Sequence, residues 1–350
     1  MPRRNTFRRI TGINLGWHPW LAEGESRGNY ADWLWLDGQL EGGYQYSMGM
    51  FGARPGGTVE SERQGGPTVD LHILTPDGKA HHGTESYPLE AFKPEPFGGT
   101  WGDNTFKGKL GPDGMPEGYD LKVSVGDVGV DLTARAVAIG LQFSDEEHGY
   151  SYYHPIKNIA LGWWPLVPRA EVEGTLTIEG KPVKVSGLAY VERQLTSMPT
   201  SFGGGGQAWW TWGHFYAGDY TAIWTDSASS EHFQYRHFSP FALWKGSDLI
   251  LSTFQFTCYV EKFGIDADSG MLYPVVESLR ASDGNVELRA QLLPGKINHI
   301  FRLGETGVYC RQYCDVNMQL RRWDDVDQES GTAVHEFGAG GHWFPFDRLK

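Results

Sequence analysis

The sequence predicts an all-β fold, and three of its features point that way. Large apolar residues alternate with small or polar ones in many short runs, which is the period of a strand with one buried face. The 47 glycines and 19 prolines are spread along the chain and separate these runs as turns would. The 14 Trp, 16 Tyr and 18 Phe favour strands and suit either a protein core or an apolar pocket.

The first half of the chain contains several such strands. Residues 33–36 are expected to form a strand that ends at the turn signal Asp37-Gly38. Glu179-Gly180 predicts a tight hairpin between two later strands. Further strands are expected at residues 44–50, 69–74, 121–125, 130–136, 175–178 and 183–190, with a short helical period at 88–92.

The second half begins with a similar aromatic unit. Residues 209–212 lead to a turn at Gly218-Asp219, after which large residues alternate again through Trp224. Pro294-Gly295 is expected to be another turn. Trp210-Thr211-Trp212 resembles Trp33-Leu34-Trp35 of the first half, which indicates either an internal duplication or a chance similarity between two strands. Later strands are expected at residues 242–244, 249–260, 286–292 and 309–321.

Four successive glycines, Gly203 to Gly206, predict a flexible loop or a junction between domains, because nothing in such a run can pack. A chain of 350 residues is long enough for two ordinary domains. We therefore expect an irregular lead-in over residues 1–28, an N-terminal β domain over 29–199 and a C-terminal β domain over 200–350.

Charge and cysteine content exclude several classes of protein. The formal net charge of −13 disfavours a nucleic-acid partner, which would require a basic surface. No apolar run follows the basic start of the chain or is long enough to span a bilayer. Cys258, Cys310 and Cys314 form no disulfide framework and fit a reducing cytoplasm. No metal site is expected, because Cys310 and Cys314 lack a second ligand pair; the oligomeric state stays open.

The end of the strand at 183–190 carries the strongest candidates for chemistry, Tyr190, Glu192, Arg193 and Gln194. A carboxylic acid that faces a water-poor aromatic cavity has its charged form disfavoured. Glu192 would then stay protonated and deliver a proton or a hydrogen bond. Neighbouring aromatic faces would stabilise positive charge on a polyene. The alternative is that Glu192 and Arg193 are charges at the rim of a pocket.

His214 is the next candidate, since it follows Trp212-Gly213 among aromatic residues. It would donate a hydrogen bond to a carbonyl or act as a base; equally, a backbone carbonyl would satisfy it. The other histidines show no metal-binding spacing, and the His81-His82 pair is expected at the surface. The sequence contains no G-x-S-x-G elbow, Walker loop or dinucleotide fingerprint, which disfavours serine-hydrolase, nucleotide and redox chemistry.

Five blocks of residues occur in an order that matches a known family. They are residues 32–37 (DWLWLD), 98–108 (GGTWGDNTFKG), 172–190, 210–226 and 331–336 (GTAVHE). Together they resemble the carotenoid 1,2-hydratase (hydroxyneurosporene synthase) superfamily, including its fungal Diels–Alderases. The resemblance implies two lipocalin-like antiparallel β-barrel or sandwich domains packed together. It also implies cofactor-independent chemistry on long apolar substrates, either alkene hydration or [4+2] cyclisation.

The chain departs from the family at one motif. Where relatives read Tyr-His-Asp-x-Asn-Trp-Gly, this chain reads Tyr-Val-Glu-Arg-Gln-Leu-Thr over residues 190–196. Glu192 keeps an acid at the position associated with alkene protonation, but its neighbours are changed. The departure puts a strict hydratase role in doubt, and Trp212-Gly213-His214 looks closer to the cyclase branch.

We therefore expect a Diels–Alderase-like cyclase of secondary metabolism that binds a hydrophobic polyene in a reactive conformation. A hydrogen bond from Glu192, His214 or Tyr190 to a substrate carbonyl would activate one end of the polyene. Two alternatives stay open: an alkene hydratase, isomerase or proton-initiated terpenoid cyclase with Glu192 as the acid, and a non-catalytic lipocalin-like carrier. The pocket is expected where residues 190–193 meet 210–214, and its expected substrate-binding side chains are Trp33, Trp35, Trp210, Trp212, Trp224, Arg193 and Gln194.

Overall fold

The computed structural model describes residues 6–10, 15–17, 31–53, 66–144, 150–154, 159–196, 207–229, 237–303 and 307–339. The chain divides into two compact units, Met1–Pro199 and Thr200–Lys350, and each is built around one large antiparallel sheet. The all-β, lipocalin-like fold class predicted above is confirmed. The four-glycine run lies outside the described residues. None of the helical segments within them has the length and hydropathy of a membrane span.

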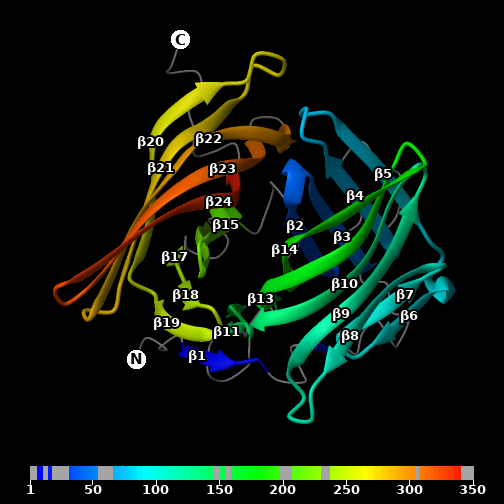
Figure 1. The fold of residues 1–350 in the computed structure, drawn as a ribbon, viewed down its shortest axis with the longest axis horizontal. Coiled ribbons are helices and arrows are strands. Elements are labelled where there is room, and N and C mark those ends of the chain that lie inside the picture. Colours follow the sequence, from blue (N-terminus) through cyan, green and yellow to red (C-terminus); the bar gives the residue numbers. More distant parts are fainter. Residues whose placement is uncertain are drawn as a thin grey trace. The chain divides into compact units, whose positions relative to one another are not determined.

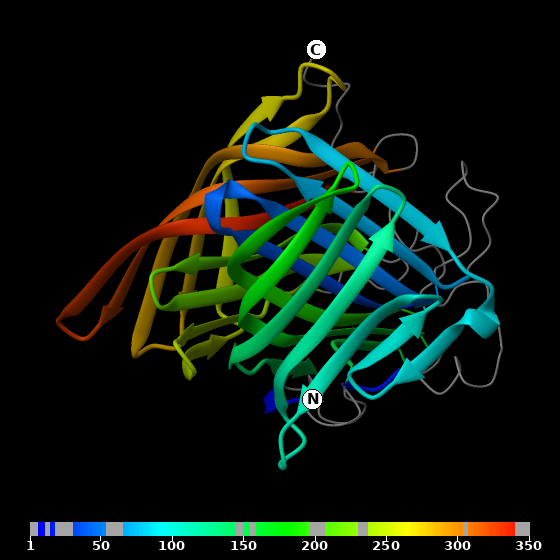
Figure 2. The same ribbon diagram turned by 45° about the vertical axis from the view of Figure 1, so that its right-hand side comes forward.

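The large sheet of the first unit is a meander whose first and last strands are neighbours. β2 pairs with β3 on one side and with β14 on the other, and the sheet extends from this pair to β5 and to β6 (Figures 1 and 2). β4 and β5 also pack against β9, so the sheet folds over on itself. In sheet order the strands are β5 (Ala80–Ser86), β4 (Thr68–Leu74), β3 (Gln45–Ala53), β2 (Ala31–Leu40), β14 (Lys181–Thr196), β13 (Ile159–Ile178), β10 (Val128–Ala138), β9 (Pro116–Val125), β8 (Asn104–Leu110), β7 (Gly98–Trp101) and β6 (Phe92–Glu95), with β12 (Tyr152–His154) beside β13.

The sheet of the second unit has the same order of connections. Its first strand, β15, pairs with its last strand, β24, and the sheet extends from this pair in both directions (Figure 1). The two Trp-x-Trp segments therefore lie on equivalent strands, β2 and β15. In sheet order the strands are β19 (Asp248–Thr253), β18 (Phe241–Lys245), β16 (Tyr220–Ser229), β15 (Gln207–Ala217), β24 (Asp325–Ala339), β23 (Gly307–Arg322), β22 (Val286–Leu303), β21 (Leu272–Ser282) and β20 (Phe256–Ile265), with β17 (His237–Phe238) beside β16.

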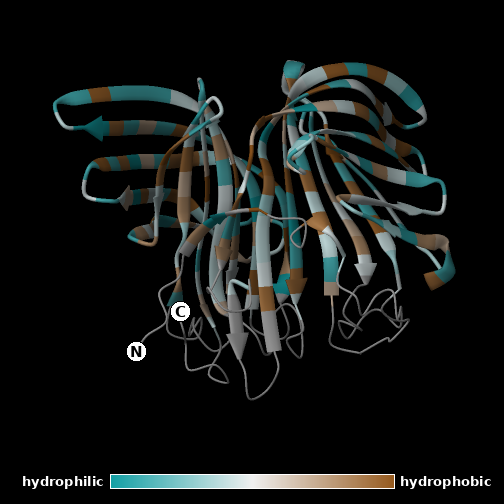
Figure 3. Cartoon of the chain, turned by 90° about the horizontal axis from the view of Figure 1, so that it is seen from below, coloured by the Kyte–Doolittle hydropathy of each residue, from teal (hydrophilic) through white to brown (hydrophobic). Residues whose placement is uncertain are grey.

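Alternating burial along the strands gives each unit its own hydrophobic core. In β9, Tyr119, Leu121 and Val123 are buried, whereas Asp120 and Lys122 between them are exposed. Figure 3 shows the same alternation as brown and teal bands along many strands. Full burial of a large apolar side chain contributes about 1.5–3 kcal/mol. This repeated burial holds the strands in register, because a shift by one residue would expose every such side chain.

The predicted hairpin at Glu179-Gly180 is confirmed. Both residues adopt the left-handed conformation, with φ of 51° and 72°, as a two-residue turn of the primed types requires. The turn at Gly218 between β15 and β16 is also present, with φ of 55°. Near residues 88–92 the helical signal corresponds to one 3-10 turn, Leu89–Ala91.

The predicted turn at Asp37-Gly38 is wrong, because both residues lie inside β2. The chain turns later, at the 3-10 element Glu41–Gly43. Gly38 is needed for close packing instead: a Cβ there would lie 2.2 Å from Cε1 of Tyr46 on the neighbouring strand. Asp37 is fully buried and accepts a hydrogen bond from Trp35 Nε1 at 3.2 Å.

Three other expectations need correction. Pro294-Gly295 makes no turn but an irregularity within β22, where a Cβ on Gly295 would meet the carbonyl oxygen of Tyr313. The strand expected at 249–260 is two strands, β19 and β20. The lead-in contains a strand, β1 (Thr6–Arg9), which pairs with β11 (Leu141–Ser144). Four residues are too few to show the alternating hydrophobic pattern of a strand, and the partner strand is distant in sequence.

Candidate functional site

The sheet of the first unit has two differently composed faces where β2, β13 and β14 meet. One face bears Leu34, Leu36 and Val191 and belongs to the hydrophobic core. On the opposite face of β14 lie Tyr190, Glu192 and Gln194, because alternate residues of a strand point the same way. On β2, Trp35 lies directly opposite Glu192 and Trp33 opposite Gln194. On β13, the other neighbour of β14, Trp163 lies opposite Gln194. We call this the aromatic–acid face of the first unit.

Glu192 is the centre of this face. Its side chain is fully buried, and Oε2 accepts hydrogen bonds from the Tyr190 hydroxyl at 2.6 Å and from Trp163 Nε1 at 2.5 Å. The side-chain amide of Gln194 donates to Oε1. An indole N–H can only donate, so Oε2 must act as an acceptor. In this arrangement both oxygens of the Glu192 carboxyl group act as acceptors, Oε2 for Tyr190 and Trp163 and Oε1 for Gln194.

Trp163 was missed by the sequence analysis, although it holds Glu192 in place. Its ring stacks on Phe143 at 5.0 Å between centroids, and Ser151 accepts its backbone N–H at 3.1 Å. The adjacent Trp164 points to the core face instead. A Trp-Trp pair in a strand places one ring on each face, and that is the signal by which Trp163 could have been found.

Arg193 does not share the face of Glu192. It lies on the core face, where Nε and Nη2 donate to the two carboxylate oxygens of Asp32 at 2.9 and 2.5 Å. Its guanidinium also lies 5.1 Å from the centre of the Trp164 ring. Both members of this bidentate ion pair are almost completely buried. The sequence places Arg193 and Glu192 side by side, but strand alternation sends their side chains to opposite sides of the sheet.

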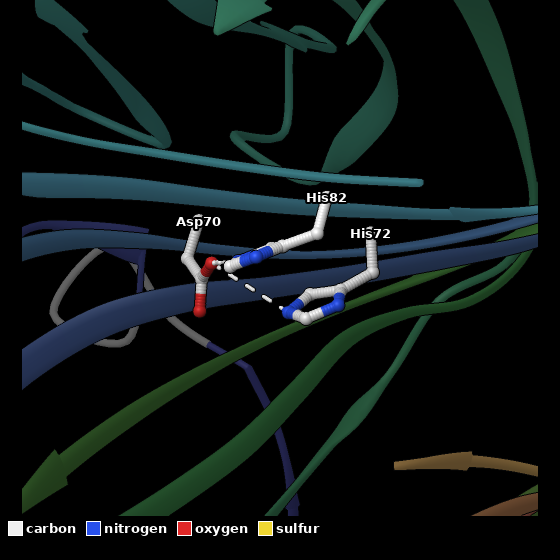
Figure 4. Close-up of side chains that lie close together, drawn as sticks. All are labelled: Asp70, His72 and His82. Carbon is white, nitrogen blue, oxygen red and sulfur yellow. Dashed lines mark hydrogen bonds and ion pairs between the residues drawn. The ribbon is translucent and has the colours of Figure 1, made fainter. Parts of the chain in front are cut away.

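A polar cluster lies on the aromatic–acid side of the sheet, on β4 and β5. Figure 4 shows the Asp70 carboxylate beside the imidazole rings of His72 and His82. The two rings stack on each other with centroids 4.1 Å apart, and Asp70 Oδ1 lies 2.6 Å from His82 Nε2 and 3.6 Å from His72 Nε2. Burial alone would raise the pKa of Asp70, but hydrogen bonds with His72 and His82 bring it well below its usual range. The hydrogen bond with Asp70 raises the pKa of His82. The sequence did not reveal this cluster, because His82 meets Asp70 only across the strand pair.

The second unit also carries aromatic side chains on the face of β15 opposite its core. Trp210, Trp212, His214 and Tyr216 alternate along this strand, and all four are buried. The His214 ring lies 5.8 Å from Trp212 and 5.3 Å from Tyr216. The structure therefore brings three of the predicted residues, Trp210, Trp212 and His214, onto one face.

Trp224 is separated from these residues. It lies opposite Gly213 in the register of β15 and β16 and belongs to the hydrophobic core of the second unit. A Cβ on Gly213 would lie 2.4 Å from the Trp224 ring. Trp224 therefore fills the core rather than joining the row of Trp210 and Trp212. Trp212 and Trp224 are close along the chain, but strand alternation through the turn at Gly218 sends their side chains to opposite faces of the sheet.

An ion pair that the sequence analysis missed lies beside this aromatic row. Glu336 of β24 is directly opposite Trp212, and it accepts a hydrogen bond from Arg311 Nε at 2.8 Å. The Arg311 guanidinium lies 5.8 Å from the centre of the Tyr309 ring. Burial raises the pKa of the Tyr309 hydroxyl well above its usual value, although the charge of Arg311 opposes the shift. Tyr309 is therefore a neutral hydrogen-bond donor at physiological pH.

The two units repeat one register. Trp35 of the first strand faces Glu192 of the last strand in the first unit. Trp212 of the first strand faces Glu336 of the last strand in the second unit. Each unit thus places a tryptophan of its Trp-x-Trp segment beside a glutamate on the face opposite its core. The predicted pocket between residues 190–193 and 210–214 combines residues of both units and stays a prediction.

Comparison with known proteins identifies the fold. The chain aligns over 90% of its length with CghA, solved with the compound Sch210972, with a TM-score of 0.64 and 14% identity over 89% of that chain. It aligns over 95% of its length with kievitone hydratase from Nectria haematococca, with a TM-score of 0.54 and 14% identity over 96% of that chain. This chain shares their fold.

A Nitrosomonas europaea protein described as a candidate AttH matches as well, over 93% of this chain and 97% of its own, with a TM-score of 0.59 and 14% identity. The resemblance seen in the sequence is confirmed at the level of the fold. No protein-family model and no curated protein sequence matches the chain.

Proposed function

We propose that this protein is a cofactor-independent cyclase that closes a ring in a hydrophobic polyene by a Diels–Alder or related intramolecular reaction. Its structural neighbours include a Diels–Alderase, CghA, and a hydratase. Both activities belong to enzymes of this fold, so the choice between them depends on the side chains of this chain. Those side chains favour cyclisation for two reasons.

The first reason is the composition of the faces opposite the cores. An antiparallel sheet that packs one face on its core commonly turns a polar face outward. Here that face carries Trp33 and Trp35 in the first unit and Trp210 and Trp212 in the second. Broad, rigid rings bury a large area with little loss of conformational freedom and would hold a flexible polyene in a folded conformer. Holding the diene and its partner alkene together lowers the entropic part of the activation free energy, by about 7–11 kcal/mol in favourable cases.

The second reason, and the observation that carries the proposal, is the set of donors around Glu192. Trp163, Tyr190 and Gln194 all donate to its carboxyl group. A carboxyl group whose two oxygens both accept hydrogen bonds is arranged to orient its neighbours, whereas hydration of an alkene needs an acid that gives up a proton. In the proposed reaction Glu192 fixes Tyr190 and Gln194 in position, and a polar group of this face binds the carbonyl that activates the dienophile.

Hydration remains the second candidate, because Glu192 is buried beside Trp163 and a desolvated carboxyl group can serve as an acid once its donors rearrange. The substrate of this reaction would be the same class of unsaturated apolar molecule. A carrier without catalysis is the third candidate.

One experiment separates the three. The protein is incubated with a linear probe in which a conjugated diene is tethered to an α,β-unsaturated ketone, and the products are analysed by liquid chromatography and mass spectrometry. A cyclase gives an isomer of unchanged mass with one enriched stereoisomer. A hydratase adds one water, and a carrier returns the probe unchanged. A product mixture identical to that formed in buffer would contradict the proposal.

The variant Glu192→Gln sharpens the result. Cyclisation should fall by about tenfold to a thousandfold, as expected when an oriented hydrogen bond is lost. A reaction that starts with a proton from Glu192 should be abolished. Glu173→Gln is the matched control, because Glu173 is an exposed carboxylate on the adjacent strand β13. Full activity of Glu192→Gln would remove Glu192 from the mechanism.

A further inference from the structure

Three potential metal ligands meet inside the second unit, on the face opposite the aromatic row. Cys258 of β20, Glu277 of β21 and His335 of β24 each offer one ligand atom, and these atoms lie within 4.8 Å of one another. β24 is separated from β21 by two strands of the sheet, so the residues meet across the interior of the curled sheet. The spacing of 19 and 58 residues between them gives no motif in the sequence.

The polar atoms of this cluster lack the hydrogen bonds that burial demands. Glu277 is 1% exposed and His335 is 0% exposed. His335 Nε2 lies 2.9 Å from Glu277 Oε2, but the contact is not aligned as a hydrogen bond. Both carboxylate oxygens and Nε2 therefore have no hydrogen-bond partner among the described residues. An unsatisfied buried polar group costs about 1–3 kcal/mol, and a buried charge costs more.

Negative groups concentrate around the same point. The carboxylate of Glu277 lies within 4.8 Å of the Cys258 thiol. The backbone N–H of Cys258 donates to Asp226 Oδ2 at 3.2 Å, which places a second carboxylate near the thiol. A cation bound between the three ligands would offset these charges and satisfy the orphaned atoms together.

We propose that Cys258, Glu277 and His335 bind a divalent transition-metal ion of the zinc class. A ligand set of one thiolate, one imidazole and one carboxylate suits zinc, whereas magnesium and calcium take oxygen ligands alone. Zinc bonds of about 2.0–2.3 Å put ligand atoms roughly 3.5 Å apart in a tetrahedral site. Small side-chain rotations would close the present separation. The thiol proton is released to solvent when the metal binds.

The surroundings of His335 fit this role. The side-chain amide of Gln312 contacts Nδ1 at 3.4 Å and donates to the carbonyl oxygen of Pro274 at 3.0 Å. Trp224 lies nearly parallel to the imidazole, at 6.5 Å between ring centroids. A partner on the second ring nitrogen fixes the orientation of a metal-binding histidine. Gln312 and Trp224 together leave Nε2 directed at Glu277.

The cluster of Asp70, His72 and His82 offers three ligand atoms with the same spread but differs in one respect. There His82 Nε2 hydrogen-bonds Asp70, and Thr84 donates to the same carboxylate at 2.7 Å. Those atoms satisfy one another, so no metal is needed to explain them. This surface cluster therefore serves as an internal control. The proposed buried site is independent of the proposed cyclisation, because it lies on the core face of the second unit.

The test uses the full chain, stripped of metal with a chelator and titrated with Co²⁺. We expect one Co²⁺ per chain with a thiolate-to-metal charge-transfer band in the near ultraviolet, and displacement of the ion by Zn²⁺. Cys258→Ser should abolish the band and weaken Zn²⁺ binding by at least about tenfold. Cys310→Ser, which removes a buried thiol outside the cluster, should keep both. Circular dichroism checks that each variant is folded.

Two outcomes would overturn the proposal. The first is a folded wild-type protein that gives no charge-transfer band with Co²⁺, a result that depends on no variant. The second is metal binding that survives Cys258→Ser and disappears in His82→Gln, which would assign the ion to the surface cluster. A failure of either kind would leave the test of cyclisation unaffected.

Discussion

The hydroxyl of Tyr190 lies 2.6 Å from Oε2 of Glu192, and both side chains point to the same face of β14. Trp163 reaches the same oxygen from β13. Two strands thus fix one carboxyl group from two sides, and they do so on the face opposite the hydrophobic core. The position of Glu192 follows from strand pairing rather than from loop geometry, which makes the site rigid and its parts testable one by one.

Tyr190→Phe removes one donor and keeps the ring. Because Glu192 is buried, the loss of a charge-assisted hydrogen bond should lower the free energy of unfolding by about 1–3 kcal/mol. Urea denaturation of both proteins measures the change. Tyr259→Phe serves as the control, since Tyr259 is 68% exposed and its hydroxyl should contribute less than about 0.5 kcal/mol. Equal effects in the two variants would show that the Tyr190–Glu192 contact contributes no stability.

Asp32→Asn breaks the buried ion pair with Arg193. The guanidinium would remain buried without its counter-charge, so we expect a loss of about 3–5 kcal/mol in the free energy of unfolding. Glu171→Gln breaks the exposed pair of Arg135 and Glu171 and should cost no more than about 1 kcal/mol.

This comparison also tests the role of Arg193. If Arg193 acts only in folding, Asp32→Asn should leave the KM for the polyene probe unchanged in the fraction of protein that stays folded. A large rise in KM at unchanged stability would instead assign Arg193 to substrate binding, as the sequence analysis expected.

Gly38→Ala tests the close packing of β2 and β3. The new methyl group would lie 2.2 Å from the ring of Tyr46, so either the ring or the strand must move, at a cost of about 1–3 kcal/mol. The thermal midpoint measures this cost. Gly126→Ala is the comparison: its added Cβ meets nothing within 4 Å, and its penalty comes from a φ of 63° alone. A neutral Gly38→Ala would show that Gly38 is not required by packing.

The Asp70–His82 pair predicts a pH dependence of stability. The pKa of His82 is raised, so its contribution is complete below the ordinary value of 6.5 and is lost as pH rises through the raised value. The pKa of Asp70 is lowered, so its contribution is complete above 3.8 and is lost as pH falls through the lowered value. The pair should therefore stabilise the fold most between pH 3.8 and 6.5.

His82→Gln should remove the loss of stability above pH 6.5, whereas Asp70 keeps its interaction with His72. The variant should cost about 1 kcal/mol or less within that window, because the pair is partly exposed. The measurement is the urea midpoint of wild type and variant from pH 4 to pH 9. His81→Gln, at the preceding position of β5, is the matched control. A difference between wild type and His82→Gln that stays constant across this range would mean that the histidine acts by packing and not by charge.

The sequence by itself determined the all-β fold and the tight hairpin at Glu179-Gly180, because period-two burial and turn chemistry are local properties. It also predicted Tyr190, Glu192 and Gln194 as site residues at the end of one strand. Because these residues alternate along β14, their side chains share a face. The Trp-x-Trp resemblance correctly marked equivalent strands, β2 and β15, of two sheets with the same connections.

Only the tertiary structure decided what depends on pairing between distant strands. Trp163 reaches Glu192, Arg311 reaches Glu336 and Cys258 meets His335 through registers that no local pattern encodes. Asp37-Gly38 has the sequence of a turn, but Gly38 is needed to leave room for the ring of Tyr46 on the neighbouring strand. That requirement cannot be seen without the strand pairing. A sequence shows which face of a strand each side chain takes, but the identity of its cross-strand partner is set by the register of the whole sheet.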